Sequence, residues 1–188
     1  MSGQETAAAA VDVSTLKCVL IVDDHPIIAT ACRLVLEPVG IETIVAAHDA
    51  VSGYEAFLEH KPDVVTIDLS LRGEEQGGLA LIRRIRANDP KAAILVFSMH
   101  ADRGSFVAAI ECGAAGYLLK DAPPEELVYA LQQAGSGRRY VDPQLAVKLA
   151  FPETALSAKE KRVLTSLLES TPYASIAKLL GKRPSRLH

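Results

Sequence analysis

The feature that most constrains the fold is a regular alternation of short apolar runs and amphipathic stretches between residues 18 and 136. The apolar runs have the length and β-branched content of strands that are buried on both faces. The stretches between them have helical periodicity and are bounded by prolines, glycines and capping residues. The predicted strands are 18–22, 42–47, 64–67, 93–97 and 116–119. Five such strand–helix units predict a parallel sheet with helices on both faces.

A sheet of this kind brings distant residues together, because the carboxyl ends of parallel strands lie at one edge. Polar residues follow four of the predicted strands: Asp23-Asp24, Asp68, Ser98 and Lys120. The fold class that we expect is α/β, with a flavodoxin-like five-stranded parallel sheet. The four groups should share one pocket.

Two of the helices carry a prediction about which side chains face the sheet. The helix that opens at Pro26 places four apolar residues on one face, namely Ile28, Ala31, Leu34 and Val35. The helix capped by Asp49 is expected to turn three inward, namely Tyr54, Phe57 and Leu58.

The predicted pocket favours phosphoryl chemistry. Three carboxylates in close quarters repel one another, and a hard cation relieves the repulsion. Oxygen ligands without His or Cys indicate Mg²⁺, and the five scattered histidines are expected to be surface or packed residues. Lys120 adds a positive charge and Ser98 a hydroxyl donor. Since a carboxylate can itself accept a phosphoryl group, the set is typical of an aspartyl-phosphate site.

Four motifs in this order resemble a known family. They are Val22-Asp23-Asp24-His25-Pro26, Ile67-Asp68-Leu69, Phe97-Ser98-Met99 and the run from Gly113 to Asp121. Together they look like a response-regulator receiver domain, and the last run is similar to the NarL/FixJ subfamily. The resemblance covers residues 17–136, after an N-terminal tail, 1–16, that is expected to be disordered.

The resemblance implies a role for each residue of the pocket. Asp68 would take a phosphoryl group from the phosphohistidine of a sensor histidine kinase. Mg²⁺ would be bound directly by Asp24 and Asp68, by Asp23 mainly through water, and by the Ser70 carbonyl. Ser98 would be the switch hydroxyl, Lys120 would pair with the phosphate, and the rotamer of Tyr117 would follow Ser98. Such a protein is a phosphoryl acceptor, not a dedicated enzyme, and is expected to form homodimers.

The loop after Asp68 departs from the family pattern. Arg72 stands where the family usually has proline, and 73–78 is slightly longer than usual. Two added carboxylates, Glu74 and Glu75, belong to this loop. The departure bears on the lifetime of the phosphate, not on the chemistry.

The region after the receiver reads as a linker, 137–155, with a short helix at 143–150, followed by a small all-α partial helix-turn-helix, 156–188. The runs 156–164 and 176–181 resemble the LuxR-type DNA-binding domain. The recognition helix has barely begun at His188, so a shortened piece and a degenerate output domain both stay open. Three basic residues are the candidates for DNA contacts: Lys182, Arg183 and Arg186.

Composition and single residues narrow the classes of function that fit this sequence. The net charge of the 188 residues is only −3, no apolar run approaches membrane-spanning length, and three distant cysteines suggest a reduced, cytoplasmic protein. A phospho-switched transcription regulator and a receiver that acts only by protein contact or dimerisation both fit. A haloacid-dehalogenase-type phosphatase fits poorly, because Ser70 stands where that family has its general acid. A flavodoxin-like electron carrier lacks the phosphate-binding loop.

Overall fold

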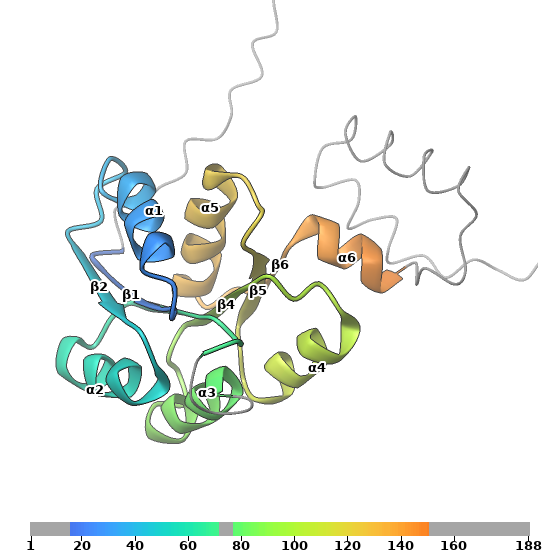
Figure 1. Cartoon of the computed structure of the whole chain (residues 1–188), viewed down its shortest axis with the longest axis horizontal. Coiled ribbons are helices and arrows are strands. Elements are labelled where there is room, and N and C mark those ends of the chain that lie inside the picture. Colours follow the sequence, from blue (N-terminus) through green and yellow to red (C-terminus); the bar gives the residue numbers. More distant parts are fainter. Residues whose placement is uncertain (1–15, 72–76, 151–188) are drawn as a thin grey trace, which may run out of the picture. The chain divides into compact units, whose positions relative to one another are not determined.

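The computed structural model describes residues 16–71 and 77–150, and these form an α/β fold with one parallel sheet (Figure 1). The strands are β1 (Cys18–Val22), β2 (Thr43–Ala47), β3 (Val64–Ile67), β4 (Ile94–Ser98), β5 (Gly116–Leu119) and β6 (Tyr140–Val141). The helices are α1 (Pro26–Leu36), α2 (Ala50–His60), α3 (Gly77–Asn88), α4 (Arg103–Glu111), α5 (Pro124–Gly135) and α6 (Pro143–Ala150). The parallel sheet and the alternation of strands and helices are confirmed.

The strand order is β2-β1-β3-β4-β5-β6, with every neighbouring pair parallel. Helices α1 and α5 cover one face of the sheet, and α2, α3 and α4 cover the other (Figure 1). Strands β3, β4 and β5 are buried along their whole length, as their continuous apolar runs predict. The order reverses at β1, so the carboxyl ends of β1 and β3 flank the crevice in which such sheets bind ligands.

The expectation of five strands was wrong by one, because β6 adds a short strand beside β5. The amide of Asp142 donates to the carbonyl of Tyr117 at 2.8 Å, and a carboxylate oxygen of Asp142 accepts from the amide of Leu119 at 3.3 Å. The Tyr140 hydroxyl donates to the carboxylate of Glu126 in α5. A strand of two residues has no period to detect, so the sequence pattern could not reveal it.

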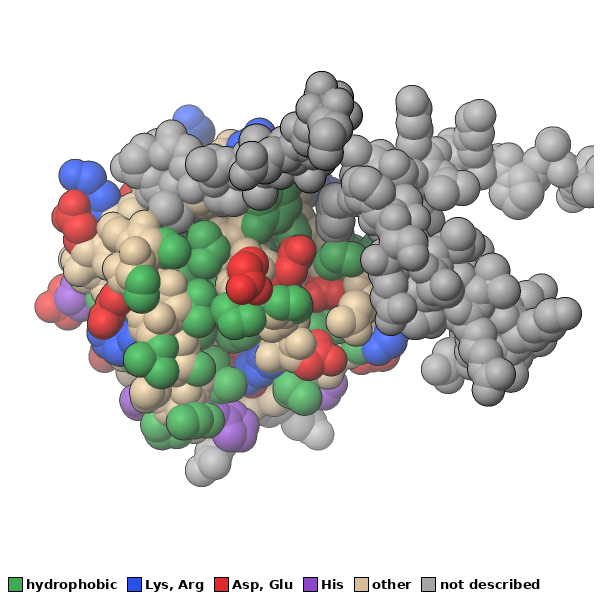
Figure 2. All heavy atoms as spheres, turned by 90° about the horizontal axis from the view of Figure 1, so that it is seen from above, with side chains coloured by type: hydrophobic (Ala, Val, Ile, Leu, Met, Phe, Trp, Pro, Cys, Tyr) green, Lys and Arg blue, Asp and Glu red, His purple; other side chains and the backbone are tan. Residues whose placement is uncertain are grey.

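The predicted inward faces of α1 and α2 were partly wrong. In α1 the buried residues are Ala29, Cys32 and Leu36, whereas Leu34 is 72% exposed. Ala31 is exposed too, while Ile28 and Val35 pack partly against the core. The face that meets the sheet is thus rotated by about one residue from the predicted one. Exposed apolar side chains are consequently interspersed with charged ones on the side of the molecule that carries α1 and α5 (Figure 2).

In α2, Phe57 is buried and Tyr54 half-buried, but Leu58 is 44% exposed. The capping of this helix is confirmed, because the Asp49 carboxylate accepts from the amides of Val51 and Ser52. Position 16, placed in the N-terminal tail by the sequence, is also part of the core, since Leu16 is 4% exposed.

The chain divides into two units, Met1–Asp142 and Pro143–His188. Within the second unit the structure describes α6, which has the predicted bounds; the predicted helix-turn-helix lies outside the described residues. Among the helices described, none is both long and apolar enough to cross a membrane.

Candidate functional site

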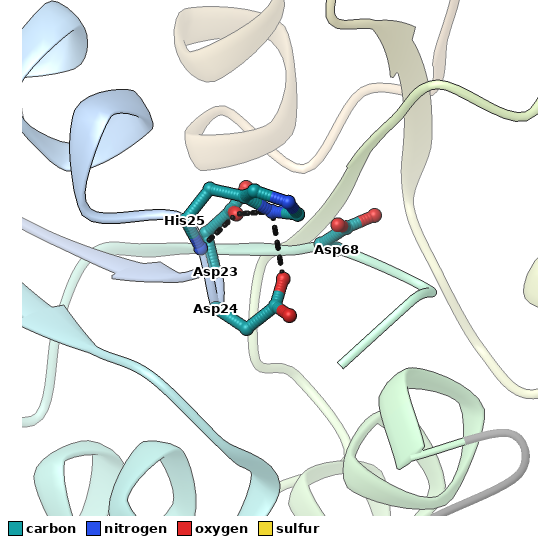
Figure 3. Close-up of side chains that lie close together, drawn as sticks. All are labelled: Asp23, Asp24, His25 and Asp68. Atoms are coloured by element: carbon teal, nitrogen blue, oxygen red, sulfur yellow. Dashed lines mark hydrogen bonds and ion pairs between the residues drawn. The ribbon is translucent and has the colours of Figure 1, made fainter. Parts of the chain in front are cut away.

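Three carboxylates meet at the carboxyl ends of β1 and β3, as the sequence predicts. Asp23, Asp24 and Asp68 are only 2%, 9% and 3% exposed. Their backbone is fixed by the sheet: the Asp68 amide donates to the Val22 carbonyl at 2.9 Å, and the Asp23 amide donates to the Ala47 carbonyl at 3.0 Å. Figure 3 shows Asp23, Asp24 and Asp68 gathered at one place beyond the strands. Burying three like charges requires compensating positive charge.

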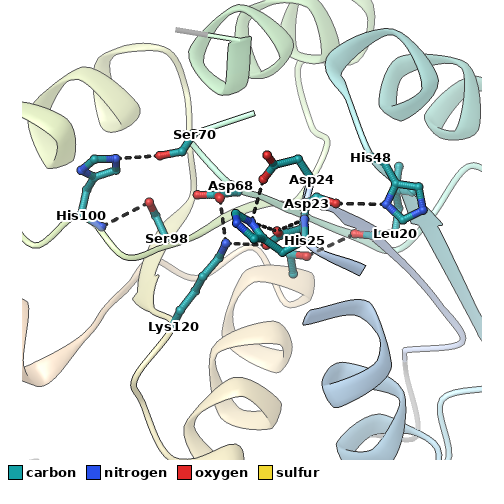
Figure 4. A network of polar contacts seen from close by, with 11 residues as sticks. Leu20, Asp23, Asp24, His25, His48, Asp68, Ser70, Ser98, His100 and Lys120 are labelled. Carbon is teal, nitrogen blue, oxygen red and sulfur yellow. Dashed lines mark hydrogen bonds and ion pairs between the residues drawn. The ribbon is translucent and has the colours of Figure 1, made fainter. Parts of the chain in front are cut away.

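Lys120, directly after β5, supplies part of that charge. Its ammonium lies 2.6 Å from Oδ2 of Asp23 and 2.7 Å from Oδ2 of Asp68 (Figure 4). Burial by itself would lower the pKa of Lys120, but the hydrogen bonds to the two carboxylates outweigh burial and raise the pKa above 10.5. The lysine is therefore a fixed cation that bridges the two carboxylates.

The second oxygen of Asp68, Oδ1, is buried without a hydrogen-bond partner among the described residues. A buried carboxylate oxygen left unpaired is unfavourable unless something else binds it. One positive charge does not neutralise three carboxylates, so this oxygen fits a divalent cation or a phosphoryl group. The cluster is consistent with the predicted metal site.

The segment that carries Asp68 is packed against the first turn of α3. A Cβ on Gly78 would lie 2.2 Å from the carbonyl oxygen of Asp68 and 2.7 Å from the Cα of Leu69. Only glycine allows the helix to approach this closely. Gly78 therefore helps to hold the segment that carries the Asp68 carboxylate in place.

A second polar group centres on His100, which the sequence analysis did not single out. The Ser98 hydroxyl accepts from the amide of His100 at 3.3 Å, and the Tyr117 hydroxyl donates to the carbonyl of His100 at 2.7 Å. The imidazole Nε2 lies 2.7 Å from the hydroxyl of Ser70, two residues after Asp68 (Figure 4). His100 thus joins three of the predicted site residues.

Burial raises the pKa of the Tyr117 hydroxyl well above its ordinary value. Tyr117 is fully buried and lies against Phe106 of α4, with 5.8 Å between the ring centroids. Its hydroxyl is therefore a neutral donor that ties β5 to the segment after β4. Of Ser70 the structure describes the side-chain contact; the role of its carbonyl stays a prediction.

His25 is the other residue that the sequence analysis passed over, because histidines were expected to be surface or packed residues. Its Nδ1 lies 2.8 Å from Oδ1 of Asp24 and 3.3 Å from Oδ1 of Asp23. The signal that could have found it is its position, directly after the Asp-Asp pair. The candidate DNA contacts Lys182, Arg183 and Arg186, and the loop residues Arg72, Glu74 and Glu75, lie outside the described residues.

Comparison with known proteins agrees with this geometry. The family described as "Response regulator receiver domain" matches residues 19–132. The chain is 34% identical over 167 residues to the methanol utilization control regulatory protein MoxX of Paracoccus denitrificans, covering 85% of this chain and 75% of MoxX. It is also 34% identical over 132 residues to the oxygen regulatory protein NreC of Staphylococcus epidermidis, covering 70% of this chain and 60% of NreC.

Two solved structures are similar to this one. A LuxR-family two-component response regulator from Aurantimonas has a TM-score of 0.67 and 38% identity, with 72% of this chain and 96% of that chain covered. The Salmonella typhimurium RcsB response regulator, described for its conformational dynamism in DNA interaction, has a TM-score of 0.67 and 26% identity, with 90% and 85% covered. The strand-end carboxylates, the lysine that bridges them and these matches lead to one assignment: the chain belongs to the response regulator receiver-domain family.

Proposed function

We propose that this protein is a response regulator of a two-component phosphorelay, in which Asp68 accepts a phosphoryl group from a sensor histidine kinase. Receivers of this kind are not dedicated enzymes, and this one is related to LuxR-type transcription regulators. The observation that carries the proposal is the state of the Asp68 carboxylate. It is buried at the ligand-binding edge, with one oxygen on Lys120 and the other without a partner among the described residues.

In the transfer, a carboxylate oxygen of Asp68 attacks the phosphorus of a phosphohistidine. An O–P bond forms, the P–N bond breaks, and the leaving imidazole keeps the electron pair. Lys120 stabilises the charge of the phosphoryl oxygens, and the hydroxyl of Ser98 can donate to them. Mg²⁺, held by Asp23, Asp24, Asp68 and the Ser70 carbonyl, would supply further positive charge.

The same contacts suggest how the phosphate changes the protein. An acyl phosphate carries about −1.5 to −2 charge at the place where the Asp68 carboxylate carried a single negative charge. A movement of the Ser98 side chain towards the phosphate would lengthen the bond that its hydroxyl accepts from the amide of His100, whose carbonyl accepts from Tyr117. The phosphate thereby shifts the equilibrium between two arrangements of the surface formed by α4, β5 and α5. This shift would change the protein contacts or the dimerisation of that surface.

For the output, we propose phosphorylation-dependent transcription regulation through DNA in the cytoplasm. The relatives support it, since they are regulatory proteins and one is described for its DNA interaction. Lys182, Arg183 and Arg186 would contact the phosphate backbone. The chain spans 60% of the length of NreC, so the alternative, an output by protein contact or dimerisation alone, is the second outcome of the DNA test.

The transfer is tested by incubation with acetyl phosphate and Mg²⁺, followed by intact mass measurement. Wild type should gain one phosphoryl mass and Asp68→Asn none, while the matched control Asp121→Asn, at an exposed position, should behave as wild type. Uptake by Asp68→Asn would refute the assignment of the acceptor.

The output is tested by DNA binding across a salt series, with the beryllofluoride-loaded chain compared with Asp68→Asn. Binding on loading only, with a steep salt slope, supports DNA as the output. Absence of binding in both, together with a change in oligomeric state on loading, supports the alternative.

A further inference from the structure

The oxygens that remain for a cation at this site are defined by the contacts of Lys120. The lysine occupies Oδ2 of Asp23 and Oδ2 of Asp68. Neither of these contacts involves Oδ1 of Asp68, and Oδ1 of Asp23 accepts from the amide of the next-but-one residue, His25, at 2.9 Å. The buried Oδ1 of Asp68 has no hydrogen-bond partner among the described residues, so a cation bound there would offset the cost of its burial.

A ring nitrogen of His25 lies in the same cluster as the carboxylate oxygens. Asp23, Asp24, His25 and Asp68 each offer one ligand atom, and all four atoms lie within 4.8 Å of one another. The imidazole of His25 lies beside the carboxylates of Asp23 and Asp24, with Nδ1 directed at their oxygens (Figure 3). Nδ1 therefore already stands among the ligand oxygens.

The backbone holds His25 in this place. The residue before a proline is restricted to extended conformations, and His25 precedes Pro26 with φ −103 and ψ 106. Its amide donates to Oδ1 of Asp23 at 2.9 Å. The ring therefore needs little ordering to bind an ion, which reduces the entropy lost on binding.

We infer that Nδ1 of His25 is a metal ligand beside the three carboxylates, so that the site favours transition-metal divalent cations over Mg²⁺ more than carboxylates alone would. The inference rests on the proposed function in one respect, namely that a divalent cation binds at these carboxylates. It does not require that Asp68 accepts a phosphoryl group. Mg²⁺ prefers oxygen ligands, whereas imidazole raises affinity along the series from Mn²⁺ to Ni²⁺. Binding uses the lone pair of Nδ1, so the ring proton is then on Nε2.

The direct test is pulsed electron paramagnetic resonance on the Mn²⁺ complex of the full chain. Wild type should show the strong ¹⁴N coupling of a directly bound imidazole, and His25→Gln should lose it. His48→Gln is the matched control, because that ring lies nearby, with Nδ1 3.2 Å from the backbone carbonyl of Asp23, outside the ligand set. The coupling should persist in this control. Since the His25 side chain is 53% exposed, its substitution should leave the core unchanged.

Affinity gives a second readout. In calorimetric titrations at one fixed pH, His25→Gln should lose about tenfold or more in Ni²⁺ affinity, with Mg²⁺ affinity nearly unchanged, because loss of a group that only orients a ligand already costs about tenfold. Absence of ¹⁴N coupling in wild type, its persistence in His25→Gln, or an equal loss for both ions would overturn the inference. Intact mass after acetyl phosphate separates the two ideas, because failure of Asp68 to gain a phosphoryl group refutes the proposed function without affecting the ¹⁴N result.

Discussion

The close approach of α3 to Asp68 gives a prediction in which two effects have opposite signs. Gly78 lies in the first turn of α3, and intrinsic helix propensity favours alanine over glycine in a helix. Alanine is better than glycine in a helix interior by about 1 kcal/mol. On helix preference alone, Gly78→Ala should stabilise the protein.

The packing around Gly78 predicts the reverse. The new Cβ would lie 2.2 Å from the Asp68 carbonyl oxygen and 2.7 Å from the Cα of Leu69, and both are backbone atoms. No flexible side chain can move aside, so either helix α3 or the segment of Asp68 and Leu69 must shift. Overpacking of this kind costs about 1–3 kcal/mol, and we take the upper end because backbone meets backbone. After subtracting the helix preference of about 1 kcal/mol, we expect a net loss of about 2 kcal/mol.

The measurement is the free energy of unfolding in urea, for wild type, Gly78→Ala and the control Gly104→Ala. Gly104 occupies the same second position in its helix, α4, but its Cβ would meet only a side-chain oxygen of Asp102 at 3.2 Å. The control should be neutral or slightly stabilised. Gly78→Ala should also take up less phosphate from acetyl phosphate. A Gly78→Ala protein as stable as the control would refute the reasoning.

Three further predictions concern buried polar groups. Lys120→Met leaves two buried carboxylates without their cation, so unfolding should become easier by about 3–5 kcal/mol at neutral pH. Because the folded pKa of Lys120 is raised above 10.5, the difference from wild type should shrink as pH rises beyond that value; a constant difference would contradict the ion-pair account. Asp142→Ala removes the acceptor of the Leu119 amide, so hydrogen exchange of this amide should become about five- to tenfold faster, as measured by nuclear magnetic resonance. Unchanged exchange would mean that the Asp142 carboxylate does not protect it. Burial, and after it the charge of Asp23, raises the pKa of the Cys32 thiol from 9.0 to about 12. The free energy of unfolding should therefore fall between these two pH values, and it should fall less steeply in Cys32→Ala than in wild type. Native Cys32 should also resist thiol reagents at pH 8, and rapid labelling there would argue against its burial.

The fold and the main carboxylate cluster could be predicted because they depend on short-range patterns. Buried parallel strands give continuous apolar runs, and their carboxyl ends share one edge. Asp23, Asp24 and Asp68 therefore followed from strand positions alone, and Lys120 from the same rule.

The parts that were missed depend on tertiary contacts that leave no periodic trace. His100 joins Ser70, Ser98 and Tyr117 partly through its own backbone, and backbone atoms are the same for every residue type. His25 is different, because it contacts its own sequence neighbours Asp23 and Asp24, and its position directly after them was a signal that the sequence analysis did not use. The exposed position of Leu34 reflects a small rotation of α1 that helical periodicity does not resolve.

The short strand β6 has a consequence for how the sheet meets other chains. Without it, β5 would offer a row of unpaired amides and carbonyls, which is a template for strand addition and aggregation. Val141 and Tyr140 pair with Tyr117 and Gly116, so this row is already taken by the same chain. Tyr140 is also anchored sideways on α5, with its ring edge-on to Tyr129 at 5.9 Å between centroids. The outermost strand on this side is therefore only two residues long, too short to recruit a neighbour as a growing sheet would.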